Sequence, residues 1–98
     1  MRPKTDGILE SSLYVEDVVL SAQFYEKIFG FRVISDFGVR GCAMEAGNHQ
    51  VLLLFKKGGS REGPSPHDGN GELHLAFAIR AEELAGWRAW LIRTTQTR

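Results

Sequence analysis

The sequence contains a single cysteine, Cys42, among its 98 residues. One cysteine cannot form an intrachain disulfide, and it cannot supply the several thiolates of a structural zinc cluster. Cys42 could be a catalytic thiol or a small buried residue in a strand. The second interpretation is favoured, because neither a helix N-terminus nor a basic neighbour in the sequence would lower the pKa of the thiol.

The sequence also lacks an excess of charge of either sign and any long apolar run. Twelve basic and twelve acidic side chains give a formal net charge of +0, which argues against a broad basic surface for nucleic acid or anionic lipid. No stretch approaches the roughly 20 apolar residues that span a bilayer, and residues 1–7 contain no apolar segment of a signal peptide. We therefore expect a cytoplasmic protein that has neither nucleic acid nor membrane as a partner.

The first 57 residues carry the pattern of a strand, a helix and three further strands. A strand is expected within residues 7–15. Asp17 is expected to cap a helix whose apolar residues recur at spacings of three and four, and Gly30 to end that helix in the left-handed conformation. Strands are expected again at 31–37, 42–46 and 50–56, the last two forming a hairpin.

The second part of the chain begins the same pattern again. Residues 57–71 contain too many Gly, Pro and polar residues for a strand and are expected to form a linker. Residues 73–79 have strand composition, and the chain from Ala81 predicts a helix with one apolar stripe, made of Leu84, Trp87, Trp90 and Leu91. A second strand followed by a helix indicates an internal duplication.

Several segments resemble the vicinal oxygen chelate superfamily, which contains glyoxalases, bleomycin-resistance proteins and extradiol dioxygenases. LYVED at 13–17 and SAQFYEKIFGF at 21–31 resemble its first strand and helix, QVLLLF at 50–55 its fourth strand, and GELHLAF at 71–77 the first strand of its second module. The resemblance covers about residues 7–91 and rests on the serial order of the pieces.

The resemblance implies an α+β fold with a defined division of the chain. Residues 1–6 would be a tail, 7–57 a βαβββ module, and 58–71 a Gly- and Pro-rich linker. Residues 72–98 would form the first strand and helix of a second module, within which the chain stops. The incomplete second module would leave a strand and an apolar helix stripe without partners, so we expect a homodimer with strands pairing across chains.

The resemblance also implies a divalent ion, Mn²⁺, Ni²⁺, Zn²⁺ or Fe²⁺, that polarises adjacent oxygens of a small-molecule substrate, as in metal-dependent lyases and dioxygenases. It places Glu10 and His74 at ligand positions on the first strands of the two modules. The alternatives are a solvent-facing carboxylate and a strand histidine satisfied by another partner. The family's usual third ligand, a Glu on the last strand of the second module, has no counterpart before Arg98, and the fourth strand offers only leucines, so weak metal binding is expected.

The other candidate features favour simpler interpretations. His49 and His67 are expected to be exposed in a turn and in the linker. The basic pair Lys56-Lys57 is too short for a nucleic-acid patch, and residues 58–60 lack the spacing of a phosphate-binding loop. Most aromatic side chains are expected in the core, although some could line a ligand cup.

Two further functions remain open at this point. One is a metal-free module of the bleomycin-resistance kind, which would hold a small aromatic or cationic ligand between subunits. The other is an inactive fragment that only self-associates. Trp87 or Trp90 fluorescence should respond to a ligand in the first case and not in the second.

Overall fold

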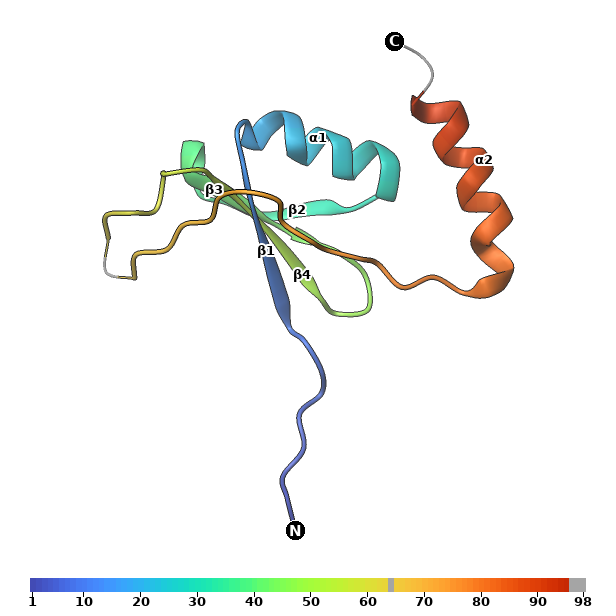
Figure 1. Ribbon diagram of the computed structural model, residues 1–98, viewed down its shortest axis with the longest axis horizontal. Helices are drawn as coiled ribbons and strands as arrows, with labels where there is room; N and C mark the ends of the chain where they lie inside the picture. Colours follow the sequence, from blue (N-terminus) through green and yellow to red (C-terminus); the bar gives the residue numbers. More distant parts are fainter. Residues whose placement is uncertain (64, 96–98) are drawn as a thin grey trace.

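The computed structural model describes residues 1–63 and 65–95, and its centre is a mixed sheet of four strands with a helix across one face (Figure 1). The strands are β1 (Glu10–Val15), β2 (Arg32–Asp36), β3 (Gly41–Glu45) and β4 (Val51–Lys56), in the spatial order β1-β4-β3-β2. β1 runs parallel to β4, and the other two pairings are antiparallel. The predicted α+β class and the βαβββ order are confirmed.

The helix α1 (Val18–Phe29) begins and ends where the capping residues predict. The Asp17 carboxylate accepts a hydrogen bond of 3.0 Å from the Leu20 backbone N–H, which satisfies one of the free donors at the helix start. Gly30 adopts a left-handed φ of 71° and donates its N–H to the Glu26 carbonyl. Both ends of α1 are therefore fixed by local sequence.

The core lies between α1 and the sheet. Met44 on β3 and Leu54 on β4 are fully buried, and they pack with Val18 and Ala22 of α1. Leu13 and Val15 extend this core along β1. Alternate residues of β1 and β4 thus point toward α1, and the residues between them form the opposite face of the sheet, which we call the outer face.

Cys42 is 5% exposed within this core. Burial is the main cause that raises the pKa of its thiol, and the nearby carboxylates of Asp36 and Glu26 raise it further. The thiolate form is therefore disfavoured, so Cys42 has the character of a buried strand residue, as predicted, and not that of a nucleophile.

The sequence prediction of a strand at 73–79 is wrong for this structure. Residues 72–80 are extended but belong to no strand, and no ladder of backbone hydrogen bonds joins them to the sheet. Side chains hold the segment instead: Leu75 packs against the core, and the Phe77 ring lies 5.3 Å from that of Phe31. A strand requires a neighbouring strand to take up its backbone groups, and the described residues offer none here.

The second helix begins as predicted and lies beside the C-terminal end of α1 (Figure 1). A 3₁₀ turn, η2 (Ala81–Glu83), leads into α2 (Leu84–Thr95). The Trp90 indole Nε1 donates a 2.8 Å hydrogen bond to the carbonyl of Ile28, and the Trp87 ring lies 5.4 Å from that of Phe29. Neither α1, α2 nor the short helical turns are long and apolar enough to cross a membrane, among the residues that the structure describes.

Candidate functional site

The outer face of the sheet carries the residue at which the sequence predicts a first-module metal ligand. The parallel register pairs Glu10 with Val51, Ser12 with Leu53, and Tyr14 with Phe55. These side chains share the face opposite α1, because the alternating residues Leu13, Leu52 and Leu54 belong to the core. The polar side chains of Glu10 and Ser12, at the N-terminal end of β1, therefore lie beside a half-buried apolar row on β4. This row consists of Val51, Leu53 and Phe55.

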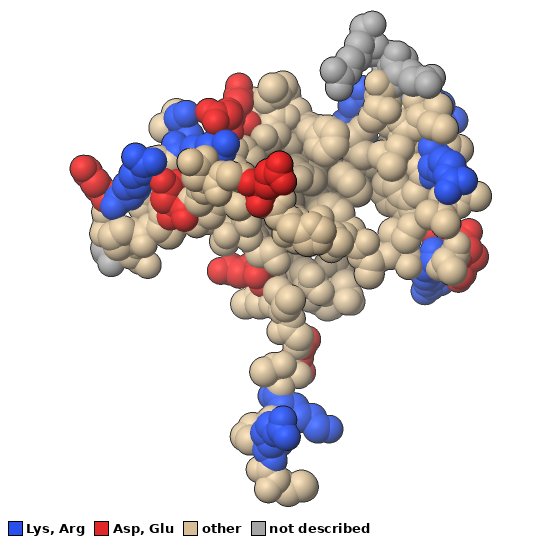
Figure 2. Space-filling model, viewed as in Figure 1, with Lys and Arg blue, Asp and Glu red and all other residues tan. Residues whose placement is uncertain are grey.

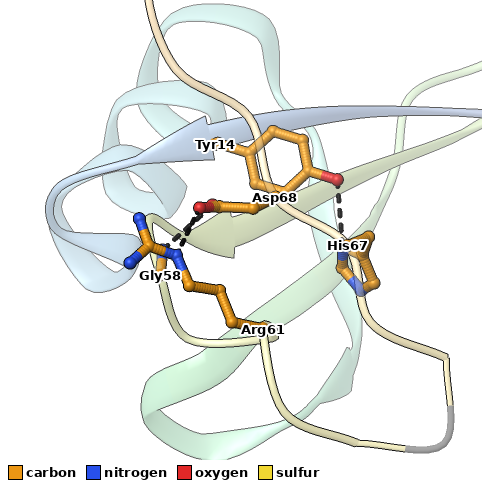
Figure 3. A network of polar contacts seen from close by, with 5 residues as sticks. All are labelled: Tyr14, Gly58, Arg61, His67 and Asp68. Atoms are coloured by element: carbon orange, nitrogen blue, oxygen red, sulfur yellow. Dashed lines mark hydrogen bonds and ion pairs between the residues drawn. The ribbon is translucent and has the colours of Figure 1, made fainter.

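The linker crosses the other end of this face (Figure 3). The Tyr14 hydroxyl lies 2.9 Å from Nδ1 of His67, and the His67 ring stands edge-on to Phe55 at 4.4 Å. The prediction that His67 is exposed is therefore wrong, since the residue is partly buried by two aromatic side chains. Sequence reasoning missed this contact because Tyr14 and His67 are far apart in the chain.

Glycine allows the linker to approach Tyr14 closely. A Cβ at Gly69 would collide with the Tyr14 ring, coming within 2.8 Å of Cε2. No other residue type fits this contact without displacing the linker or the ring. His49, by contrast, lies exposed in the turn between β3 and β4, as predicted, and has a left-handed φ of 60°.

An ion pair closes the linker into a loop (Figure 3). The Asp68 carboxylate accepts hydrogen bonds from Arg61 Nε at 2.7 Å and from the Gly58 backbone N–H at 3.0 Å. The hydrogen bond from Arg61, followed by that from Gly58, lowers the pKa of Asp68 from its ordinary value of 3.8 to about 2. The loop is thus tied both to itself and, through His67, to the sheet.

The two predicted metal ligands lie on different segments. Glu10 begins β1 on the outer face, and His74 lies in the extended segment 72–80; both residues are exposed. Neither side chain takes part in a hydrogen bond or ion pair found within residues 1–63 and 65–95. Nor do the described residues contain any group of three or more His, Cys, Asp or Glu side chains that could hold a metal ion. One carboxylate and one imidazole do not by themselves make a complete site for the expected divalent ions.

An apolar pocket of about 510 Å³ is formed by α2, the last residue of α1, Phe31 before β2 and the extended segment 72–80. Its walls are mostly aromatic and aliphatic: Phe29, Phe31, Phe77, Leu84, Trp87 and Leu91. Several of the aromatic side chains that the sequence suggested for the core therefore face this pocket, while Tyr25 packs behind them and burial raises the pKa of its hydroxyl. Figure 2 shows mainly uncharged surface in the centre of the molecule and mixed charges toward its edges.

The sheet order β1-β4-β3-β2, the capped helix α1 and the extended segment that leads into α2 are the features of a glyoxalase-type fold. The family model of the Glyoxalase/Bleomycin resistance protein/Dioxygenase superfamily matches residues 7–94 of this chain. The chain belongs to this superfamily. No curated protein sequence matches it.

Solved structures share the fold at low sequence identity. A lactoylglutathione lyase from Agrobacterium tumefaciens superposes with a TM-score of 0.86 at 23% identity, over 95% of this chain and 73% of that one. An integron cassette protein from the mobile metagenome of V. cholerae has a TM-score of 0.72 at 26% identity, over 97% and 72%. The fosfomycin resistance protein FosX from Listeria monocytogenes has a TM-score of 0.65 at 18% identity, over 94% and 67%.

Proposed function

We propose that this protein binds a small molecule with adjacent oxygen atoms on the outer face of the sheet, and acts on it with the help of a divalent ion. The observation that carries the proposal is the position of Glu10. Its carboxylate starts β1 on the outer face, beside the apolar row that begins with Val51, and it makes no ion pair within the described residues. An unpaired carboxylate next to half-buried apolar surface is suited to hold a metal ion against an organic substrate.

In this proposal Glu10 and His74 supply two of the protein ligands. Each is exposed and not engaged by another side chain of the described chain, so both could turn toward an ion without breaking a contact. A third donor would come from another segment or from a second copy. When bound, the ion would supply Lewis-acid polarisation of the substrate oxygens.

Thermal unfolding with and without Mn²⁺, Ni²⁺, Zn²⁺ or Fe²⁺ tests the metal proposal. At a concentration 100 times the dissociation constant, a bound ion stabilises the fold by about 2.7 kcal/mol. His74→Ala and Glu10→Gln should each remove the shift in Tm. His49→Asn is the matched control, because His49 is an exposed histidine in a turn and Asn tolerates its left-handed backbone. No shift with any of the four ions, or a shift that both site variants retain, would contradict the proposal.

The same proposal includes a homodimer. The accessible surface of the chain is 7994 Å², against about 5,600 Å² for a compact protein of this mass. Its radius of gyration is 15.5 Å, against about 13 Å for this length. Two segments project from the sheet in Figure 1, the N-terminal tail and the region around α2.

Such an excess is larger than the area that each partner contributes to a standard interface, about 800 Å². A second copy could therefore cover segment 72–80 and the adjoining face of α2, with strands pairing across chains. Light scattering at micromolar concentration should give twice the mass of one chain. A monomer mass would reject the dimer and leave the metal proposal to be judged by its own test.

A metal-free binding function is the second candidate, and the apolar pocket beside α2 favours it. Trp87 and Phe77 line this pocket together with Arg88. The guanidinium disfavours a cationic ligand, so an apolar aromatic molecule is the better fit. Quenching of Trp87 fluorescence by naphthalene-type probes, lost in Leu84→Glu but retained in Glu10→Gln, would support this function over the metal-dependent one.

A further inference from the structure

A second pocket, of about 380 Å³, lies between the linker loop, the C-terminal end of β4 and the segment that joins β2 to β3. Its walls include Phe37 before β3, Phe55 on β4, Arg40 in the 3₁₀ turn η1 (Gly38–Arg40), and Ser60, Glu62 and His67 of the loop. Tyr14, which anchors the loop, is four residues along β1 from Glu10, or about 13 Å at the rise of a strand. This pocket is therefore separate from the proposed ligand position at Glu10.

Two flat aromatic surfaces form one side of the pocket. The rings of Phe37 and Phe55 are nearly parallel, with centroids 6.5 Å apart and an angle of 17° between their planes. The His67 ring meets Phe55 edge-on at 4.4 Å. Two nearly parallel rings, flanked by an imidazole inclined at 65° to Phe55, offer both faces and edges to a further ring, and this geometry suits a planar aromatic ligand.

The polar groups of the pocket include one that is buried without a partner. Ser60 is 4% exposed, and its Oγ makes no hydrogen bond within the described residues. A buried hydroxyl is normally paired, since an unpaired one loses its hydrogen bonds to water on folding. A ligand atom that bonds Ser60 would remove this deficit.

Arg40 and His67 add hydrogen-bond donors that are suited to a carboxylate. Arg40 forms none of the ion pairs found within residues 1–63 and 65–95, and its guanidinium is suited to pair with a carboxylate. When the Tyr14 hydroxyl donates to His67 Nδ1, the neutral imidazole carries its proton on Nε2, which is then a second donor. Glu62 contributes one negative charge to the same pocket, which opposes a second negative charge on a ligand.

From these contacts we propose that this pocket is a binding site for a small aromatic monocarboxylate. The ring lies against Phe37 and Phe55, and the carboxylate accepts hydrogen bonds from Arg40 and Ser60. The site does not depend on a metal at Glu10 or on the function proposed above.

Calorimetric titration of the full chain with phenylacetate tests the proposal. Arg40→Gln should weaken binding about tenfold, the usual effect of losing a charged hydrogen bond. Ser60→Ala should weaken it severalfold without lowering the Tm, because the variant removes an unpaired hydroxyl from the folded protein. Arg2→Gln, in the N-terminal tail, is the matched charge control and should bind as the parent does.

Ligand analogues test the charge preference of the pocket. The neutral phenylacetamide and the dianionic phenylphosphonate should both bind more weakly than phenylacetate, and Glu62→Gln should improve the dianion more than the monoanion. Glu10→Gln should leave all three affinities unchanged. The absence of phenylacetate binding at millimolar concentration, or binding that neither Arg40→Gln nor Ser60→Ala weakens, would overturn the proposal, whatever the outcome of the metal tests.

Discussion

The Tyr14 hydroxyl on β1 bonds the His67 imidazole, 53 residues further along the chain, at 2.9 Å. This hydrogen bond holds the linker against the end of the outer face, where Phe55 stacks beside Tyr14. The opposite end of the same face, with Glu10 and Ser12, lies beyond this contact. One pair of side chains thus divides the outer face into a covered and an accessible part.

Replacing Tyr14 with Phe tests how firmly the linker is held. The variant keeps the ring contacts with Phe55 but loses the hydrogen bond to His67, so we expect the free energy of unfolding to fall by about 1 kcal/mol. Amide hydrogen exchange at residues 65–69 should accelerate more than exchange in β3. Tyr25→Phe is the control, because the Tyr25 hydroxyl has no hydrogen-bond partner among the described residues. Equal exchange rates in Tyr14→Phe and the parent would mean that other contacts hold the linker.

Gly69→Ala tests the close approach between linker and ring. The added Cβ would collide with the Tyr14 side chain, so we expect a loss of about 1–3 kcal/mol as ring or linker moves. Gly63→Ala is the matched control in the same loop, because a Cβ there meets nothing within 4 Å. The urea midpoint of Gly69→Ala should be clearly lower than that of Gly63→Ala. Similar midpoints would show that the linker can move away from the Tyr14 ring with little loss of stability.

The ion pair of Asp68 predicts a change in the linker at acid pH. Its pKa is lowered in the folded protein, so the stabilisation is fully present above the ordinary value of 3.8 and is lost as the pH falls toward about 2. The chemical shift of the Gly58 amide should follow this transition, since that amide donates to Asp68.

Two variants separate the causes of the Asp68 transition. Arg61→Gln should move it to higher pH, because the hydrogen bond from Arg61 is the largest cause of the lowered pKa. Asp68→Asn should abolish the titration of the Gly58 amide. A transition at the same pH in Arg61→Gln and the parent would contradict the assignment.

Trp90→Phe tests the attachment of α2 to α1. The variant loses the indole hydrogen bond to the Ile28 carbonyl, and leaves Trp87 as the single tryptophan. We expect the Trp87 emission to shift to the red as α2 loosens, with a loss of about 1 kcal/mol in stability. Arg93→Gln removes only the cation 5.4 Å from the Trp90 ring, and should change stability by less than about 1 kcal/mol.

Local sequence was enough to predict the first module. Asp17 and Gly30 fix the ends of α1 through hydrogen bonds to residues close by in the chain, and the continuous apolar run at residues 51–55 predicts β4. The hairpin of β3 and β4 follows from the Gly47 turn. Caps, apolar runs and tight turns each involve residues that are close together in the chain, so they can be predicted from the sequence.

The parts of the structure that the sequence did not predict depend on contacts between residues far apart in the chain. Residues 73–79 have the composition of a strand, yet the described chain provides no strand beside them. His67 has the surroundings of a solvent-exposed linker residue, yet Tyr14 and Phe55 partly bury it. The pocket at Ser60 brings together three separate segments, so no spacing in the sequence could have revealed it. The metal roles of Glu10 and His74 stay predictions.

The parallel pairing of β1 with β4 has a consequence for synthesis on the ribosome. β1 leaves the exit tunnel first, but its neighbour in the sheet is the last strand of the module, so Glu10–Val15 has no partner until Val51–Lys56 emerges. At ~5–20 residues per second this delay lasts on the order of seconds. During that interval the nascent chain exposes Leu13 and Val15, and a chaperone that binds short apolar segments has time to reach them before the sheet closes.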